Sequence, residues 1–269
     1  MNPVLVDQGD SPIILGQPHG GTFVPDIIKA QFNDRGRELT DTDWHINRLY
    51  AGLLPGVTVV QATFHRYVID ANRDPVGASL YPGQNTTGLC PTTDFDGRPI
   101  WTQTPDAAEI EARRLQFHAP YHAALAAEVA RVKALHGVAI LFDCHSIRSH
   151  IPFLFAGQLP LFNIGTNDAA SCATAVSDVV FAPYFAAAET VLNGRFKGGW
   201  TTRHYGTPAQ NVHAIQLEIA QRGYLDTESA PWAYAPAKAA ILRDTLSHCL
   251  SNLDRLARSG QLIYGGSHA

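Results

Sequence analysis

Short runs of β-branched and other apolar residues recur along this chain and alternate with longer helical patterns. Four runs have the length and composition of buried strands, at residues 13–15, 57–60, 138–142 and 214–217. Helical patterns lie at 43–54, at 121–135, from 169 into the 180s, and at 235–256. Strands that alternate with helices predict an α/β sandwich with a largely parallel or mixed sheet.

The composition indicates a compact domain that acts on small molecules. The chain has 269 residues, of which 45% are hydrophobic and 16% charged. No linker or internal repeat divides it, so we expect one domain over residues 1–269 rather than two small ones. The net charge of −4, without any run of Lys or Arg, argues against nucleic acid or an anionic membrane as the main partner.

The sequence also predicts where the protein works. Its first residues lack the basic and apolar regions of a secretory signal, and no segment approaches the roughly 18 apolar residues of a membrane span. We therefore expect a cytoplasmic protein. Four widely spaced cysteines suit reduced thiols better than a disulfide scaffold or a thiolate zinc site: Cys90, Cys144, Cys172 and Cys249.

Polar residues stand at the ends of three of the predicted strands. His19 follows the first strand in a tight turn, Asp143 and His145 end the third, and Glu218 interrupts the last apolar run. Ligands of open α/β sheets bind outside the carboxyl ends of the strands, so these positions are expected to converge on one site. Asp143, two residues before His145, lies on the same strand face and can orient its imidazole.

Two of these residues also have a structural interpretation. His19 can serve as a turn residue that bonds its own backbone. Glu218 can form an ion pair with Arg203 or Arg222, although a glutamate between two apolar neighbours is costly to bury without a role.

A further carboxylate is expected near the start of the helix at 43–54. An apolar stripe marks its buried side: Ile46, Leu49, Tyr50 and Leu53. At about 100° per residue Asp43 lies near the edge of this stripe, and Asp41 points almost opposite to it. Asp43 is therefore the better inward carboxylate, unless it only stabilises the first helical turn.

Cationic residues gather in the segment FHRYVIDANRDP at 64–75. Arg66, Asn72 and Arg73 suit the capture of a substrate carboxylate, although Arg73 can instead form an internal salt bridge with Asp70 or Asp74. Arg148 and Arg203 are further candidates, and His204 adjoins the second. The loop-like segments 77–105 and 193–205 are expected to border the pocket.

Six motifs in order carry a family resemblance: PHGGTFVPD, DTDWHINRLYA, RYVIDANRDP, DCHSIRS, NGRFKGGWTTRHYG and QLEIAQRGYLD. From about residue 10 to residue 260 the chain resembles the N-formylglutamate amidohydrolase (N-formylglutamate deformylase) family of histidine catabolism. The resemblance implies a single-domain, three-layer phosphorylase/hydrolase-like α/β fold related to zinc carboxypeptidases. It also implies one divalent metal ion, expected to be zinc, and hydrolysis of N-formyl-L-glutamate to L-glutamate and formate.

The resemblance also implies roles for individual residues. A first motif His-x-x-Glu is typical of the wider superfamily, but Thr22 stands at the glutamate position here, and we expect Asp43 to replace it. The expected roles are metal ligation by His19, Asp43 and His145, proton transfer by Glu218, oxyanion stabilisation by Arg66 or Arg148, and substrate binding by Asn72, Arg73, Arg148 and Arg203.

Two alternatives remain open from the sequence. One is a zinc-dependent deacylase or carboxypeptidase-like hydrolase that acts on another N-acyl amino acid. The other is a binding protein that keeps the metal but has no activity, which the presence of Glu218 opposes. The sequence does not indicate an oligomeric state.

Overall fold

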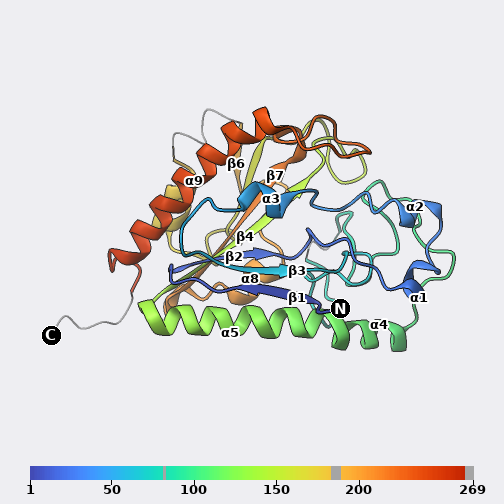
Figure 1. Ribbon diagram of the computed structural model, residues 1–269, viewed down its shortest axis with the longest axis horizontal. Coiled ribbons are helices and arrows are strands. Elements are labelled where there is room, and N and C mark those ends of the chain that lie inside the picture. Colours follow the sequence, from blue (N-terminus) through green and yellow to red (C-terminus); the bar gives the residue numbers. More distant parts are fainter. Residues whose placement is uncertain (81–82, 183–188, 264–269) are drawn as a thin grey trace.

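A mixed sheet of seven strands forms the centre of the computed structural model, which describes residues 1–80, 83–182 and 189–263 (Figure 1). The strand order is β1-β3-β2-β4-β7-β5-β6. The strands are β1 (Val4–Asp7), β2 (Ile13–Gln17), β3 (Thr58–Ala62), β4 (Ala139–Ile147), β5 (Phe162–Gly165), β6 (Thr190–Leu192) and β7 (Val212–Ala220).

The four strands predicted from apolar runs are β3, β2, β4 and β7, which are parallel neighbours at the centre of the sheet. β1 pairs antiparallel with β3, β5 pairs antiparallel with β7, and β6 runs parallel to β5. These three outer strands were missed because each has only three or four residues. The carboxyl ends of the four central strands therefore meet at one edge.

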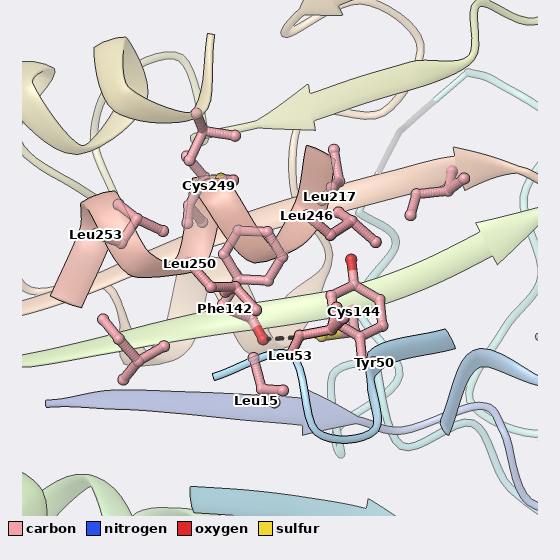
Figure 2. Packing of buried hydrophobic residues seen from close by; sticks show 14 of the residues in the cluster. Leu15, Tyr50, Leu53, Phe142, Cys144, Leu217, Leu246, Cys249, Leu250 and Leu253 are labelled. Carbon is pink, nitrogen blue, oxygen red and sulfur yellow. Dashed lines mark hydrogen bonds between the residues drawn. The ribbon is translucent and has the colours of Figure 1, made fainter. Parts of the chain in front are cut away.

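Helices cover both faces of the sheet, so the fold has three layers (Figure 1). In β2, Ile13 and Leu15 belong to the core beneath α9 (Pro236–Arg258), whereas Ile14 belongs to the core beneath α5 (Ala119–His136). Burial of every residue of β4 and β7 follows from this double cover. Figure 2 shows the α9 side, where leucines of that helix pack against strand residues: Leu15, Phe142, Leu246, Leu250 and Leu253.

The helices are α1 (Asp26–Lys29), α2 (Asp34–Arg37), α3 (Ile46–Tyr50), α4 (Ala107–Arg113), the π-helical turn η1 (Arg114–His118), α5 (Ala119–His136), α6 (Thr174–Val180), α8 (Trp200–Tyr205), the short 3-10 turns η2 (Pro208–Gln210) and η3 (Gln221–Gly223), and α9 (Pro236–Arg258). The predicted helices at 121–135 and 235–256 correspond to α5 and α9. The pattern that begins at residue 169 forms α6, and its predicted continuation at 183–188 lies outside the described residues.

The helix predicted over residues 43–54 is shorter at both ends, since α3 covers only Ile46–Tyr50. His45 has a φ of 58°, in the left-handed region, so α3 begins only at Ile46 and Asp43 precedes it. The angular argument for Asp41 fails for the same reason. Asp41 is also buried, and its carboxylate accepts hydrogen bonds from the Tyr67 hydroxyl and the Phe95 N–H.

All four cysteines are buried free thiols, as the sequence predicted. Across the described ranges, no helix combines the length and the apolar character needed to cross a membrane.

Candidate active site

Three potential metal ligands converge at the carboxyl edge of the central strands. His19 lies two residues after β2, Asp43 precedes α3, and His145 is in β4. The two Nδ1 atoms are 3.1 Å apart, and Asp43 Oδ2 lies 3.4 Å from that of His145 and 3.8 Å from that of His19. All three residues are at most 2% exposed. The structure thus brings together the three residues that the sequence singled out as ligands.

In both imidazoles, the Nε2 atom, which points away from the ligand cluster, lies beside a carboxylate. Nε2 of His19 lies 2.7 Å from Asp70 Oδ1, and Nε2 of His145 lies 3.1 Å from Asp143 Oδ2. A carboxylate accepts hydrogen bonds, so each Nε2 carries a proton and each Nδ1 turns toward Asp43. Such carboxylate partners are typical of metal-bound histidines because they fix the tautomer and the ring orientation.

The electrostatics of this cluster favour a cation among the three ligand atoms. Burial lowers the pKa of His145, but the charge of Asp143 and hydrogen bonds to Asp143 and Asp43 raise it well above its ordinary value. Burial and the nearby Arg66 lower the pKa of His19 to about 4. In the chain without a metal ion, a proton on His145 therefore offsets the negative charge of the neighbouring carboxylates. A divalent ion can take the place of that positive charge, and two imidazoles with one carboxylate are ligands that fit zinc or a similar ion.

Glu218 and Arg66 flank the cluster. Glu218 lies directly opposite His145 in the register of β4 and β7. Burial raises the pKa of Glu218 to about 7, against the opposing effect of the His145 charge. Its carboxyl group can therefore accept and release a proton near neutral pH. The buried Arg66 guanidinium contacts His19 Nδ1, lies 3.6 Å from Asp43 Oδ1, and packs over the Phe95 ring.

A pocket opens onto these groups and takes its walls from both predicted loops. Segment 77–105 contributes Leu80, Thr86, Thr87 and Phe95, and segment 193–205 contributes Arg195, Phe196 and Gly199. The remaining lining residues come from the strand ends, from the arginine-rich segment and, for Leu154, from the turn after β4: His19, Arg66, Asn72, Arg73, His145, Ser146, Ile147, Leu154, Gln216 and Glu218. The pocket thus joins cationic side chains to the candidate metal ligands.

Asn72 and Arg73 line this pocket and also make internal contacts. The Asn72 amide lies 3.0 Å from His145 Nε2 and accepts a hydrogen bond of 2.8 Å from the Thr201 N–H. Arg73 donates to the carbonyl and the hydroxyl of Thr87, at 2.8 and 2.9 Å, and lies 3.7 Å from Asp70. The internal salt bridge considered for Arg73 therefore coexists with its place in the pocket wall.

Arg148 and Arg203, two other candidates for substrate binding, lie outside the lining of this pocket. Arg148 is 3.1 Å from Asp96, and Arg203 donates to the Gly198 carbonyl at 2.9 Å. Arg222, the other partner considered for Glu218, lies 2.7 Å from Glu189.

Comparison with known proteins places the chain in a family. The model of the N-formylglutamate amidohydrolase family matches residues 11–225. The chain belongs to this family. It is 48% identical over 255 residues to N-formylglutamate deformylase of Pseudomonas aeruginosa, covering 91% of this chain and 94% of that one. It is 43% identical over 251 residues to N-formylglutamate deformylase of Pseudomonas putida, covering 91% and 93%.

A solved structure of N-formylglutamate amidohydrolase from Ralstonia eutropha JMP134 shares the fold. The TM-score is 0.80 at 24% identity, and the match covers 97% of this chain and 100% of that one. The similarity supports the single-domain α/β architecture with its mixed sheet.

The sequence analysis missed several residues that the structure places in or beside this candidate site. Asp70 was considered only as a salt-bridge partner, and Gln216 and Arg195 were not considered at all. Gln216 was detectable, because it is a second polar residue in the apolar run that contains Glu218. Thr22, three residues after His19, is exposed, whereas Asp43 supplies a buried carboxylate.

Proposed function

We propose that this chain hydrolyses N-formyl-L-glutamate to L-glutamate and formate with the help of one divalent metal ion, zinc in our assignment. The observation that carries the proposal is the convergence of His19, Asp43 and His145 beside Glu218 in an arginine-lined pocket. Membership in the N-formylglutamate amidohydrolase family supports the substrate. Two curated relatives named as N-formylglutamate deformylases support the reaction.

The metal would be held by Nδ1 of His19, Nδ1 of His145 and a carboxylate oxygen of Asp43. When bound, such an ion supplies Lewis-acid polarisation of a carbonyl group and lowers the pKa of a water molecule to about 7. Asp70 and Asp143 keep the two imidazoles in the tautomer that this ligation requires.

The chain's own residues move the protons. Glu218 accepts a proton from the water that attacks the formyl carbon, so a new C–O bond forms. Arg66 faces the cluster and stabilises the negative charge that develops on the formyl oxygen. Glu218 then returns the proton to the glutamate nitrogen as the C–N bond breaks, and formate and L-glutamate leave. A pKa of about 7 suits Glu218 for both transfers.

The pocket walls account for the substrate class. N-formyl-L-glutamate carries two carboxylates and no cationic group, so its site needs positive walls. Arg73 and Arg195 provide them, and Asn72 lines the same pocket. We assign Arg148 and Arg203, which lie outside the pocket, to holding its surrounding loops.

Metal content and formate release from the purified chain test the proposal together. We expect about one zinc-type ion per chain, loss of activity after treatment with a chelator, and recovery on addition of zinc. An active preparation that contains no metal would exclude the metal mechanism. A metal-loaded chain that releases no formate would exclude the substrate, and assays with other N-acyl amino acids would then follow.

Two further proposals rest on the same features. We propose a relation to zinc carboxypeptidases, supported by the histidine and carboxylate ligands at strand ends and by a glutamate on a neighbouring strand. We also propose that the enzyme works in the cytoplasm, on the sequence grounds given above.

A further inference from the structure

One continuous helical segment binds a short stretch of backbone beside the active site. Arg113, at the end of α4, donates to the Val68 carbonyl at 3.3 Å. His118, at the end of η1, donates from Nε2 to the Arg73 carbonyl at 3.0 Å. His122, in the first turns of α5, donates from Nε2 to the Ala71 carbonyl at 2.7 Å.

The π-helical turn explains how these donors share one side of the helix. In η1 the Ala119 N–H donates to the Arg114 carbonyl, five residues earlier, rather than to the residue four earlier. The wider turn brings residues five apart, such as Arg113 and His118, onto the same side. His122 follows His118 by four residues, which keeps it on that side in the α-helix that continues.

The stretch held in this way carries contacts to both candidate metal-ligand histidines. Asp70 binds His19 Nε2, and Asn72 lies 3.0 Å from His145 Nε2. Arg73, at its end, lines the pocket. The two carbonyls that the histidines bind belong to the residues immediately before and after Asn72, so their hydrogen bonds fix the backbone on both sides of it.

Both histidines are suited to a permanent donor role. A carbonyl only accepts hydrogen bonds, so each Nε2 carries the ring proton. Burial lowers the pKa of His122 to about 3 and also lowers that of His118, so both rings stay neutral. Around His122, Nδ1 lies 3.1 Å from the Tyr205 hydroxyl and the ring packs edge-on against Trp200. Neither ring has solvent exposure above 9%.

We propose that His118 and His122 are positioning residues, which hold the backbone at 71–73 so that Asp70 orients His19, Asn72 stays beside His145 and Arg73 meets the substrate. The part that concerns substrate and metal rests on the proposed function. The histidines act through this backbone stretch and contact neither substrate nor metal.

The test compares two substitutions at His122 in the full-length chain. His122→Leu removes the N–H donor, whereas His122→Gln keeps an N–H group at a similar distance from the backbone. For His122→Leu we expect a KM for N-formyl-L-glutamate about tenfold higher, and a zinc affinity about tenfold lower by chelator competition. His122→Gln is expected to restore most of both.

His213→Leu is the matched control. His213 is also fully buried and also forms a hydrogen bond to the backbone, but it lies at the other end of β7 from Glu218. Its loss is expected to lower the melting temperature without changing KM or zinc affinity. His118→Leu and His118→Gln form a second pair, which replaces the first if His122→Leu does not fold.

The outcomes separate the two proposals. A folded His122→Leu enzyme with unchanged KM and zinc affinity would overturn the positioning role, and so would a His122→Gln enzyme as impaired as His122→Leu. If the unmodified chain releases no formate, the proposed function fails, while the zinc-affinity comparison still decides the role of the histidines.

Discussion

The two halves of the active site are built in different ways. His145 and Glu218 lie in β4 and β7, at paired positions of a parallel ladder that runs from Ala139 to Ile147 and is buried along its whole length. The opposite half, with Thr87, Phe95 and Arg195, belongs to loops. Backbone pairing fixes the first half, and side-chain contacts fix the second.

In the loop half, guanidinium groups bind backbone carbonyls of neighbouring segments. Arg73 holds Thr87, and Arg195 donates to the carbonyls of Leu154 and Asn85 at 3.0 and 2.8 Å. From this difference between the two halves we infer that strand residues determine the chemical step and loop residues determine which substrate binds. Substitutions in the strand half should lower kcat, and those in the loop half should change KM and specificity.

The largest effect is expected in the strand half. Glu218→Gln keeps the shape of the side chain and removes its proton acceptor, so kcat should fall by roughly 10² to 10⁴ with metal content unchanged. Glu128→Gln is the control, because Glu128 is a buried carboxylate paired with Arg131 outside the pocket. Loss of metal from the Glu218 variant would instead make Glu218 a ligand.

A smaller effect is expected from Arg73→Lys in the loop half. Lysine keeps the charge but loses the planar fork that binds Thr87, so kcat/KM for N-formyl-L-glutamate should fall by about 10- to 100-fold, mainly through KM. A neutral formamide of the same size should lose much less, because it has no carboxylate to bind.

Arg243→Lys is the control for that experiment. Its guanidinium also binds backbone carbonyls, those of Arg48, Leu49 and Ala51, but it lies outside the pocket. Equal losses on both substrates in the Arg73 variant would show a structural role, and recognition would then be sought at Arg66 or Arg195.

The smallest effect concerns the size of the acyl group. The centre of the Phe95 ring lies 4.9 Å from the Arg66 guanidinium, and that guanidinium contacts His19. Phe95 therefore forms the apolar wall close to the candidate metal position. Phe95→Ala should raise kcat/KM for N-acetyl-L-glutamate several-fold relative to N-formyl-L-glutamate. Phe95→Leu should give an intermediate ratio. An unchanged ratio in a stable variant would place the acyl group elsewhere in the pocket.

The contrast between the strand half and the loop half also explains which parts of the site the sequence could predict. His19, His145 and Glu218 were predicted to lie together because a polar residue beside a buried apolar run is costly without a role, and because parallel strands bring their carboxyl ends to one edge. The central strands themselves were predicted for the same reason, since burial on both faces leaves continuous apolar runs.

Other parts depended on contacts that local patterns do not contain. Asp43 was chosen from a helical angle, yet it lies before the helix and is oriented by a hydrogen bond from the Ser146 N–H. Asp70 has arginines close in sequence with which an ordinary salt bridge is equally plausible, and nothing in the segment around Arg195 marks that residue for the site. Their place in the site depends on where long segments without regular structure cross the sheet edge, which only tertiary packing decides.

The strand order described above also determines when the active site can form during translation. The chain is made from residue 1 onward, and β7, which pairs with β4 and carries Glu218, begins only at Val212. Until β7 leaves the ribosome, the edge of β4 that pairs with β7 is open, and His145 has no strand neighbour at that edge. A nascent chain stopped before Val212 therefore lacks the pocket, and the enzyme becomes competent late in translation.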